Sequence, residues 1–531
     1  MLDRENVIRA VQHLEAVGDT DLFPRLPEMQ FFGANLDQVA DLVGNLNLGN
    51  YNPVSSVEVL TPKSSLGFRI GHQLTATDVL IYTASVIECA VGIQNLRDRT
   101  SEEIPFSYKY DPDGGARLFE LNRGFHDWLA HLATFGESDI FEDAKPVLET
   151  DISDFYQRIY FHRIENILND VGASRGSNGA IRKVIQVCRS KQSFGLPVGS
   201  SASRLLAEGL LCDTDRLLID MGLQASRYVD DYRIIGNDRH NTHTILCRLA
   251  EHLMVTEGLS LNVAKTRIVD THSLHHSAQE RLQDVFTSAE MRAFRQHLST
   301  AYGDEEVDDE EGDEEEDEVS PDNPFLSGED LMERLNDLKQ RGADFSSRKA
   351  ILKVLRSVST FDAAALLRDH ADLAYHLPRD FCRAVRASLD VGSSDVDEVE
   401  AAVWELLQRP PISELSYARL WLLNLYANGS LPADRKLIGN QIGQPSTLEE
   451  RQLIFIRARL NDRAFFREHR GRLGQVGEWL KPALLIGGAC LPADEYRTWV
   501  DIAVRQLIDP FAQAFGTWLK QGQDIELLMS V

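Results

Sequence analysis

Cysteine is scarce in this 531-residue chain, and none of its six cysteines lies in a CxxC pair. Disulfide scaffolds and zinc sites need paired or closely spaced cysteines, so the spacing argues against both and favours reduced thiols in a cytoplasmic protein. The sequence also lacks an apolar run of membrane length and a signal-peptide pattern, so we expect no membrane partner. The scattered cysteines are Cys89, Cys188, Cys212, Cys247, Cys382 and Cys490.

Positive charge is also in short supply, because 55 Lys and Arg stand against 82 Asp and Glu and the net charge is −27. A surface of that sign repels nucleic acid. The excess is partly local, since Asp304–Glu318 holds thirteen acids in fifteen positions. We expect a locally basic groove on an acidic body, although ordinary solvated surface charges would give the same pattern. The basic residues in question are Arg182, Lys183, Arg189, Lys191, Arg227 and Arg233.

The acidic block also divides the chain. Like-charge runs of this length stay disordered and act as linkers, and the chain is long enough for two or three domains with cores of their own. The sequence therefore predicts a mostly helical N-terminal region at 1–117, a central domain of strands and helices at 118–300, an acidic disordered linker at 301–324 and a helical domain at 325–531.

The helical domain shows apolar residues at helical spacing, with Pro, Gly, Asn or Asp at the breaks. This pattern predicts stacked helix pairs in an irregular α-solenoid without a strict repeat period. The expected helices are Leu331–Lys339, Arg348–Ser357, Val399–Leu407, Tyr417–Tyr426, Leu448–Leu460 and Tyr496–Ile508.

Two adjacent carboxylates, Asp230 and Asp231, stand between the apolar runs Ala225–Val229 and Tyr232–Ile235. The pattern predicts a β-hairpin with acids at its tip. Carboxylates side by side repel each other, and a divalent cation between them makes the arrangement favourable. A solvated acidic turn is the alternative.

A third carboxylate, Asp151, follows the apolar pair Val147 and Leu148 and precedes a helical pattern that begins at Phe155. Asp151 should therefore end a strand, and three carboxylates from neighbouring strands can hold two Mg²⁺ ions, with Mn²⁺ as a substitute. The alternative is that Asp151 caps the helix, a role that Asp154 could also fill.

Two further segments contain residues that could contact a substrate or a leaving group. The loop Phe194–Ser203 contains Gly195 and Gly199, so its backbone can approach a substrate closely, although it also reads as a loop and a helix start capped by Ser200 or Ser201. The segment Leu261–Thr266 contains Lys265, which could protonate or neutralise a leaving pyrophosphate, or lie on the surface.

The order of these segments resembles the palm of a reverse transcriptase. Thr150–Tyr156 looks like motif A, Phe194–Ser203 like motif B, Tyr228–Asp231 has the YxDD form of motif C, and Leu261–Thr266 looks like motif D. The resemblance implies that Asp151, Asp230 and Asp231 are the catalytic, metal-binding triad.

The same resemblance implies the remaining site residues. Ile152 would offer its backbone carbonyl to a metal, and Tyr156 falls on the steric-gate position that rejects a ribose 2′-hydroxyl. Lys109 is the candidate for gripping the triphosphate, because cationic side chains pair with phosphate oxygens. The full nucleotide-binding set is Asp154, Phe155, Tyr156, Lys109, Gly199 and Lys265.

A narrower resemblance is to the bacterial defence-associated, abortive-infection ("unknown group") reverse transcriptases. It implies an α+β fold with the fingers and palm of a right-hand polymerase at 1–117 and 118–300. An all-α, helical-repeat (HEAT-like) C-terminal domain then replaces the thumb. The segments that carry it are Gly18–Pro24, Phe106–Tyr110, Asp151–Glu165, Gly195–Glu208 and Arg227–Arg233.

This group implies a cytoplasmic bacterial DNA polymerase of antiphage defence that uses dNTPs and forms homo-oligomers. Val198 stands where many reverse transcriptases carry a glutamine, and a valine cannot hydrogen-bond a template base. Synthesis without a template, with the DNA attached to a protein hydroxyl, therefore stays open beside copying of a partner noncoding RNA and beside a catalytically silent RNA-binding scaffold. The priming residue, the oligomeric state and the activation trigger stay open too.

Overall fold

The structure is a computed structural model that describes residues 2–20, 22–63, 66–100, 104–136, 144–188, 192–283, 327–343, 345–439 and 443–530. Contacts divide the chain into two compact units. Unit 1 comprises Met1–Asp19, Val43–Ser55 and Asp78–Glu314, and unit 2 comprises Thr20–Leu42, Ser56–Thr77 and Glu315–Val531. The predicted linker at 301–324, together with Arg189 and Lys191, lies outside the described residues.

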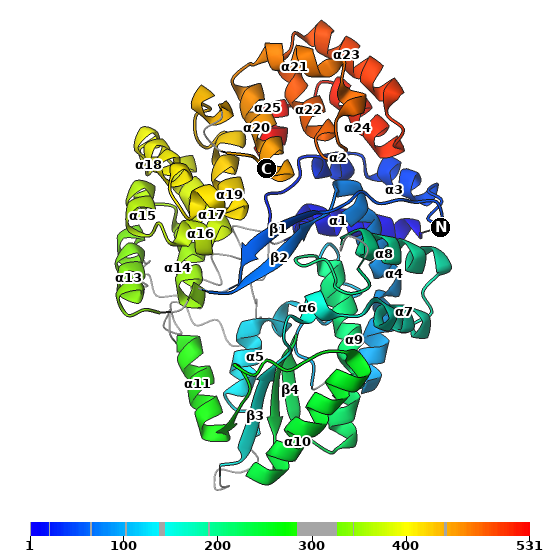
Figure 1. Cartoon of the computed structure of the whole chain (residues 1–531), viewed down its shortest axis with the longest axis vertical. Coiled ribbons are helices and arrows are strands. Elements are labelled where there is room, and N and C mark those ends of the chain that lie inside the picture. The colour runs from blue at the N-terminus through cyan, green and yellow to red at the C-terminus, as the bar shows by residue number, and fades with distance from the viewer. Residues whose placement is uncertain are drawn as a thin grey trace, which may run out of the picture. The chain divides into compact units, whose positions relative to one another are not determined.

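Unit 1 is built around a four-stranded antiparallel sheet in the order β4-β5-β3-β6 (Figure 1). Its strands are β3 (Pro146–Asp151), β4 (Ala225–Tyr228), β5 (Asp231–Ile235) and β6 (Arg267–Asp270). The predicted hairpin is confirmed as β4 and β5, and β3 ends at Asp151 as expected. Its helices are α1 (Arg4–Ala16), α4 (Ala76–Thr100), α5 (Phe125–Leu132), α6 (Phe155–Arg158), α7 (Phe161–Asp170), α8 (Arg175–Cys188), α9 (Ser201–Asp220), α10 (Arg239–His252) and α11 (Thr271–Gln283).

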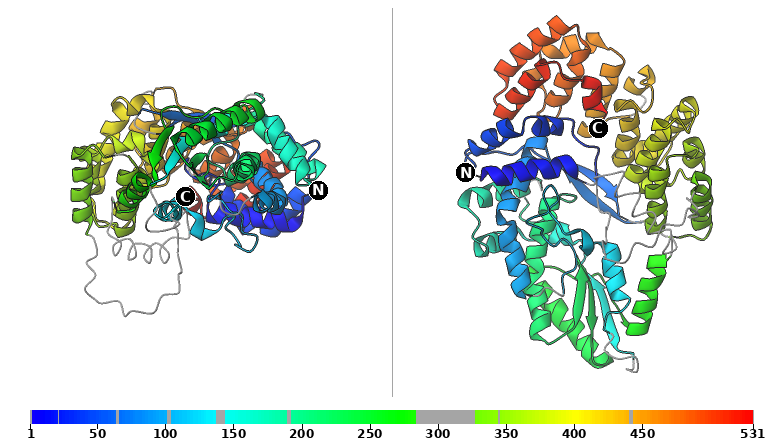
Figure 2. Two further views of the ribbon diagram at one scale, coloured as in Figure 1. Left: turned by 90° about the horizontal axis from the view of Figure 1, so that it is seen from below. Right: turned by 180° about the vertical axis from the view of Figure 1, so that it is seen from behind.

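Alternation along the strands gives the sheet two different faces. Val147 pairs with Ile235 and with Val269, so these three side chains share one face, which α5 and α11 cover (Figures 1 and 2). Trp128 on α5 is fully buried against them and donates from Nε1 to Ser226 Oγ at 2.9 Å. This packing fixes the face from which the acids at the strand ends project.

The opposite face carries Leu148, Ile234 and Tyr232, all fully buried. It packs against α10 and is tied to α9 by the Tyr232 hydroxyl, which lies 3.3 Å from Asp215 Oδ1. With both faces covered, β3 and β5 are held rigidly in the middle of the layered unit.

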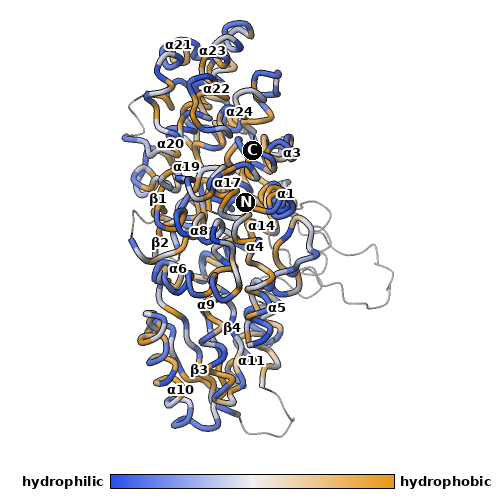
Figure 3. Tube along the Cα trace, turned by 90° about the vertical axis from the view of Figure 1, so that its right-hand side faces the viewer, coloured by the Kyte–Doolittle hydropathy of each residue, from blue (hydrophilic) through white to orange (hydrophobic). Residues whose placement is uncertain are grey.

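The long apolar helix α4 is a core element of unit 1. By length and composition alone it is the one described helix that could cross a membrane, so the expectation that the chain has no apolar run of membrane length was wrong. In the structure, 78% of its most apolar 18-residue window is buried inside the protein, which is typical of a core helix. Hydrophobic and hydrophilic residues alternate along most of the other helices (Figure 3).

Unit 2 combines the C-terminal helices with two N-terminal segments. The six helices expected from periodicity are confirmed, each within three residues of its predicted ends. The hairpin of β1 (Val57–Pro62) and β2 (Phe68–Gln73) lies in a region expected to be mostly helical. The helices are α2 (Met29–Ala34), α3 (Leu36–Gly44), α13 (Gly328–Gln340), α14 (Phe345–Val358), α15 (Ala363–Asp369), α16 (Leu373–His376), α17 (Pro378–Asp390), α18 (Val396–Gln408), α19 (Ser416–Ala427), α20 (Thr447–Arg459), α21 (Arg463–Arg470), α22 (Lys481–Gly487), α23 (Ala493–Gln506), α24 (Pro510–Lys520) and α25 (Ile525–Met529).

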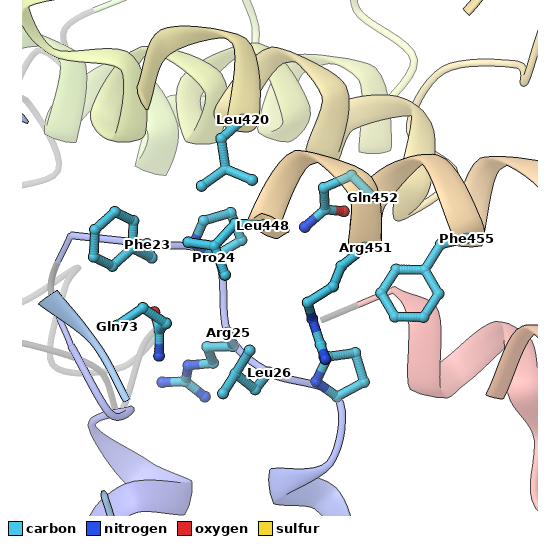
Figure 4. A pocket seen from close by; sticks show the side chains of 11 residues that line it. Phe23, Pro24, Arg25, Leu26, Gln73, Leu420, Leu448, Arg451, Gln452 and Phe455 are labelled. Carbon is cyan, nitrogen blue, oxygen red and sulfur yellow. The ribbon is translucent and has the colours of Figure 1, made fainter. Parts of the chain in front are cut away.

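Buried polar contacts join the N-terminal segment of unit 2 to its helices. Arg451 on α20 donates from Nη2 to both Glu28 carboxylate oxygens at 2.7 Å, and Trp421 on α19 donates to the Leu22 carbonyl at 2.9 Å. Arg451 also lines a small cavity of about 10 Å³ with Phe23 (Figure 4). A space of that size holds about one water molecule, so it is a packing gap.

Two local expectations were wrong. The aromatic residues of Pro105–Tyr110 favour a strand, but the segment forms only isolated bridges from Pro105 to Arg227 and from Tyr110 to Phe119. The helix expected to run on from Phe155 is broken into α6 and α7, because Ile159 adopts an extended backbone (ψ 120°) between them. The break lets the backbone of this segment pair with the loop before α9.

Candidate active site

The register of the central sheet places two of the predicted acids face to face. Asp151, the last residue of β3, is the antiparallel partner of Asp231, the first residue of β5. Residues directly opposite each other in such a pair have Cβ atoms about 4.5–5.5 Å apart, and like charges in these positions repel. The fold therefore brings together two carboxylates that are 80 residues apart in the sequence.

The turn between β4 and β5 carries the third acid, Asp230, and is held in a strained conformation. Val229 has a φ of 55°, a left-handed backbone that a β-branched residue rarely adopts. Three hydrogen bonds hold it: Val229 N donates to Ser107 Oγ at 2.8 Å, Arg227 Nη1 donates to the Val229 carbonyl at 3.1 Å, and Ile152 N donates to the Asp230 carbonyl at 3.2 Å. The last bond ties the turn directly to the end of β3.

A fully buried ion network supports this turn. Arg227 donates to both oxygens of Asp215 at 2.8–3.0 Å and to Glu208 Oε2 at 2.9 Å. Burial alone would lower the pKa of Arg227, but the charges of Asp215 and Glu208 hold it well above the usual value. Glu208 also accepts from Ser107 Oγ at 2.7 Å and lies 3.3 Å from Arg97 Nη1. The network therefore reaches the turn through both Arg227 and Ser107.

The chain's own cations neutralise the two facing acids. Lys265 Nζ lies 3.1 Å from Asp151 Oδ2, which also accepts from Asn262 Nδ2 at 3.2 Å. Asp231 is hydrogen-bonded to Arg233, whose Nε lies 3.3 Å from Glu149 Oε1. Burial raises the pKa of Asp231, and Arg233 only partly offsets it. With the side chains in these pairings, no three His, Cys, Asp or Glu of the described residues group as a metal site.

The predicted nucleotide-binding residues of motif A lie just beyond Asp151. Asp154 is exposed and has a φ of 48°, and although it is the N-cap residue of α6 its side chain makes no capping bond. Phe155 is buried, with its ring in edge contact with Tyr156. Burial, followed by the nearby Tyr108, raises the pKa of Tyr156 well above its usual range, and the charge of Asp230 adds to this. Tyr156 therefore lies close to the motif C turn.

The motif B loop is held against motif A by its backbone. Gly195 N donates to the Ile159 carbonyl and Leu196 N to the Tyr156 carbonyl, both at 2.8 Å. Gly195 and Gly199 have φ values of 95° and 105°, which a residue with a side chain rarely adopts. The two glycines therefore allow the bends that place this loop beside Tyr156.

Three cationic side chains that we expected to be available to a ligand are paired with carboxylates of the protein. Lys109 pairs with Glu120 at 2.9 Å, so gripping a triphosphate would require it to leave that partner. Arg227 and Arg233, which we expected to line a basic groove, are buried and held by carboxylates. The sequence analysis assigned no role to Glu208 or Asn262, although both lie in segments that it named, and it missed Asp215, which lies outside them.

Comparisons with known proteins bear on this site. The family described as "Reverse transcriptase (RNA-dependent DNA polymerase)" matches residues 117–285, which include all four strands of the sheet. The chain carries a reverse transcriptase domain. No curated protein matches the chain.

Two solved telomerase structures are similar to the chain that contains this domain. One, from Candida albicans "in complexe with TWJ fragment of telomeric RNA", is 11% identical, with a TM-score of 0.31 and coverage of 73% of this chain and 68% of that one. The other, apo telomerase from Candida tropicalis, is 8% identical, with a TM-score of 0.30 and coverage of 94% and 74%. At such scores we base no conclusion on either.

Replacing Arg227 with Met should strongly destabilise unit 1. The change leaves Asp215 buried without its main partner, and removing one member of a buried ion pair costs about 3–5 kcal/mol. Urea titration with pulse proteolysis measures the loss, and Arg216→Met, an exposed position on α9, is the matched control. A loss below about 1 kcal/mol, the range of ordinary point changes, would contradict the importance of the network.

Replacing Asp231 with Asn should stabilise the protein at neutral pH. In the folded protein the pKa of Asp231 is raised above its ordinary value of 3.8. The Asp231 side chain therefore favours folding below pH 3.8, where it is protonated, and this contribution to stability is lost as the pH rises through the folded-state pKa. Thermal unfolding of Asp231→Asn should therefore begin at higher temperature than that of the wild type at pH 7, and the difference should shrink toward pH 4. An unchanged or lower melting temperature at pH 7, with exposed Asp220→Asn as control, would contradict this.

Proposed function

We propose that the chain is a DNA polymerase of the reverse transcriptase type that adds dNTPs at a site formed by Asp151, Asp230 and Asp231. The observation that carries the proposal is the direct pairing of Asp151 with Asp231 across β3 and β5, with Asp230 in the adjoining turn. The reverse transcriptase match over residues 117–285 supports the same reading.

The donor set suits Mg²⁺, a hard cation that prefers carboxylate oxygens and substrate phosphates. When bound, a pair of Mg²⁺ ions, or Mn²⁺ in their place, would polarise an attacking 3′-hydroxyl and stabilise the leaving pyrophosphate. The three carboxylates and the Ile152 carbonyl would hold the ions once Arg233 and Lys265 release Asp231 and Asp151. Because Lys265 is exposed, it can then turn toward the pyrophosphate and give it a proton.

The remaining predicted residues would bind the nucleotide. Tyr156, close to the motif C turn, would exclude the ribose 2′-hydroxyl. Gly199 would let the motif B backbone approach the incoming nucleotide. Lys109 would exchange Glu120 for the triphosphate, and Asp154 and Phe155 would border the sugar. All of these positions belong to unit 1.

We further propose that synthesis needs no template, starts from a protein hydroxyl and serves bacterial antiphage defence by abortive infection. Val198 supports the first part, because its buried, apolar side chain offers a template no hydrogen bond. The resemblance to the defence group supports the rest, including a cytoplasmic homo-oligomer with a HEAT-like helical domain in place of the thumb.

Labelled dNTPs and Mg²⁺, with no added template or primer, should give long DNA with the purified wild-type chain. Asp230→Ala with Asp231→Ala should reduce incorporation by about 100-fold or more, a loss that corresponds to roughly 2.7 kcal/mol of transition-state stabilisation. Asp220→Ala, an exposed acid on α9, is the control, and chelation with EDTA should stop the wild type.

The outcomes of this assay separately test the catalytic residues, the need for a template and protein priming. Equal labelling by the wild type and the double variant would overturn the catalytic assignment. DNA that forms only after RNA is added would replace the untemplated reading with the templated one. A product whose mobility does not change after protease treatment would overturn protein priming.

Replacing Tyr156 with Ala should let the enzyme incorporate ribonucleotides. Removal of the ring opens space for a 2′-hydroxyl, whereas Tyr156→Phe keeps the ring and should keep the selectivity. The measurement is the ratio of kcat/KM for a dNTP and the matching NTP, which we expect to fall by about tenfold or more, or roughly 1.4 kcal/mol. An unchanged ratio in Tyr156→Ala would refute its role as the gate.

A further inference from the structure

One face of α8 forms a cavity outside the candidate active site. The cavity has a volume of about 620 Å³, and α8 is labelled in Figure 1. The opposite face of the helix is buried through Ala180, Ile181 and Val184. The residues that line the cavity are Leu48, Gly49, Arg175, Gly176, Gly179, Arg182, Lys183 and Gln186, so we call it the α8 groove.

The groove is strongly positive, because its lining includes three cations and no acid. Arg175 is exposed and forms no hydrogen bond or ion pair within the described residues. Arg182 is also exposed, and it pairs with Glu165, which does not line the groove, at 3.6 Å while its guanidinium lies 5.8 Å from the centre of the Phe161 ring. A concave surface of one charge focuses the electrostatic potential, and here it does so on a chain whose net charge is −27.

Lys183 supplies charge and also fixes the far wall of the groove. Its Nζ donates to the carbonyls of Gly49 at 2.6 Å, Tyr51 at 2.8 Å and Leu48 at 3.4 Å. All three donors of the ammonium are therefore used on neutral groups, and no carboxylate of the residues that the structure describes pairs with it. The wall is held in place without loss of the positive potential.

Glycines form the floor of the groove. A Cβ added at Gly179 would meet nothing within 4 Å, and one at Gly176 would lie 3.1 Å from Leu48 Cδ1. Glycine weakens a helix relative to alanine, and no packing within the described residues requires it at position 179. Its effect is to open the helix backbone to close approach by a ligand.

We propose that the α8 groove binds the phosphodiester backbone of a single-stranded nucleic acid. Arginine forks match phosphate oxygens, and Arg175 and Arg182 begin about 10 Å apart along the helix, which favours successive phosphates over one ion. The volume is in the range of small-ligand sites, too small to seat a duplex. Because α8 lies within the matched reverse transcriptase residues, a nucleic-acid strand is the polyanion to expect there.

The proposal rests on the proposed polymerase function only for the identity of the ligand, so binding is tested without catalysis. The full chain is titrated, in EDTA, into a fluorescent oligothymidylate of about 20 nucleotides, and anisotropy is followed. Arg175→Glu with Arg182→Glu should weaken binding by about tenfold or more, and Arg175→Ala with Arg182→Ala should reduce the salt slope by about 1.4. Because EDTA withholds the divalent cation, the outcome of this titration does not depend on polymerase activity.

Matched variants separate the groove from general charge and from small anions. Arg216→Glu with Arg248→Glu makes the same charge change at exposed positions of α9 and α10, and equal weakening by both double variants would overturn the proposal. Gly179→Leu fills the groove without changing charge and should also weaken binding, whereas wild-type affinity would overturn it. If tripolyphosphate binding is lost in Arg175→Glu with Arg182→Glu while oligonucleotide binding is kept, the groove takes free phosphates and the proposal fails.

Discussion

The ion pair between Arg227 and Asp215 is the interaction on which the candidate site depends. Both side chains are fully buried, and a buried charge is tolerated only when it is paired and hydrogen-bonded. The pair fixes Arg227 so that its remaining donor reaches the Val229 carbonyl and holds the left-handed turn. That turn sets the start of β5, and the start of β5 sets the partner of Asp151. The buried ion network on one face of the sheet thus controls the geometry of the acids at the strand ends.

The second constraint is the repulsion that this geometry creates. Asp151 and Asp231 face each other, and the chain places Lys265 and Arg233 on them. Arg233 also serves the fold, since it bridges to Glu149 in the same layer. A metal ion would therefore compete with internal counter-ions. The two counter-ions let the acids stay close in the folded chain. Lys265 is the easier of the two to displace, because it is exposed whereas Arg233 is buried.

Much of this arrangement could be predicted from the sequence, and the features that could not be predicted share a physical reason. The hairpin of β4 and β5, the end of β3 and the C-terminal helices follow from alternation, turn residues and helical periodicity, which are local properties. Burial and partners are not local. We expected Arg227 and Arg233 to be groove cations because a sequence shows charge without showing which carboxylate faces it. Asp215 was missed because it lies on α9 beyond the part of that helix that the motifs include. The β1–β2 hairpin was missed because a helical interpretation was extended across it.

Net charge is a poor guide to what such a chain binds, because a ligand meets the potential of one surface and not the sum over 531 residues. Arg227 and Arg233, two of the six cations that the sequence placed in a groove, are neutralised inside unit 1, so they offer nothing to a polyanion. The cations that remain at the surface of α8 have no carboxylate among the residues lining their cavity, and glycines lower the helix surface between them. The position of each charge relative to its nearest acid, rather than the count of bases and acids, decides where a phosphate chain can lie.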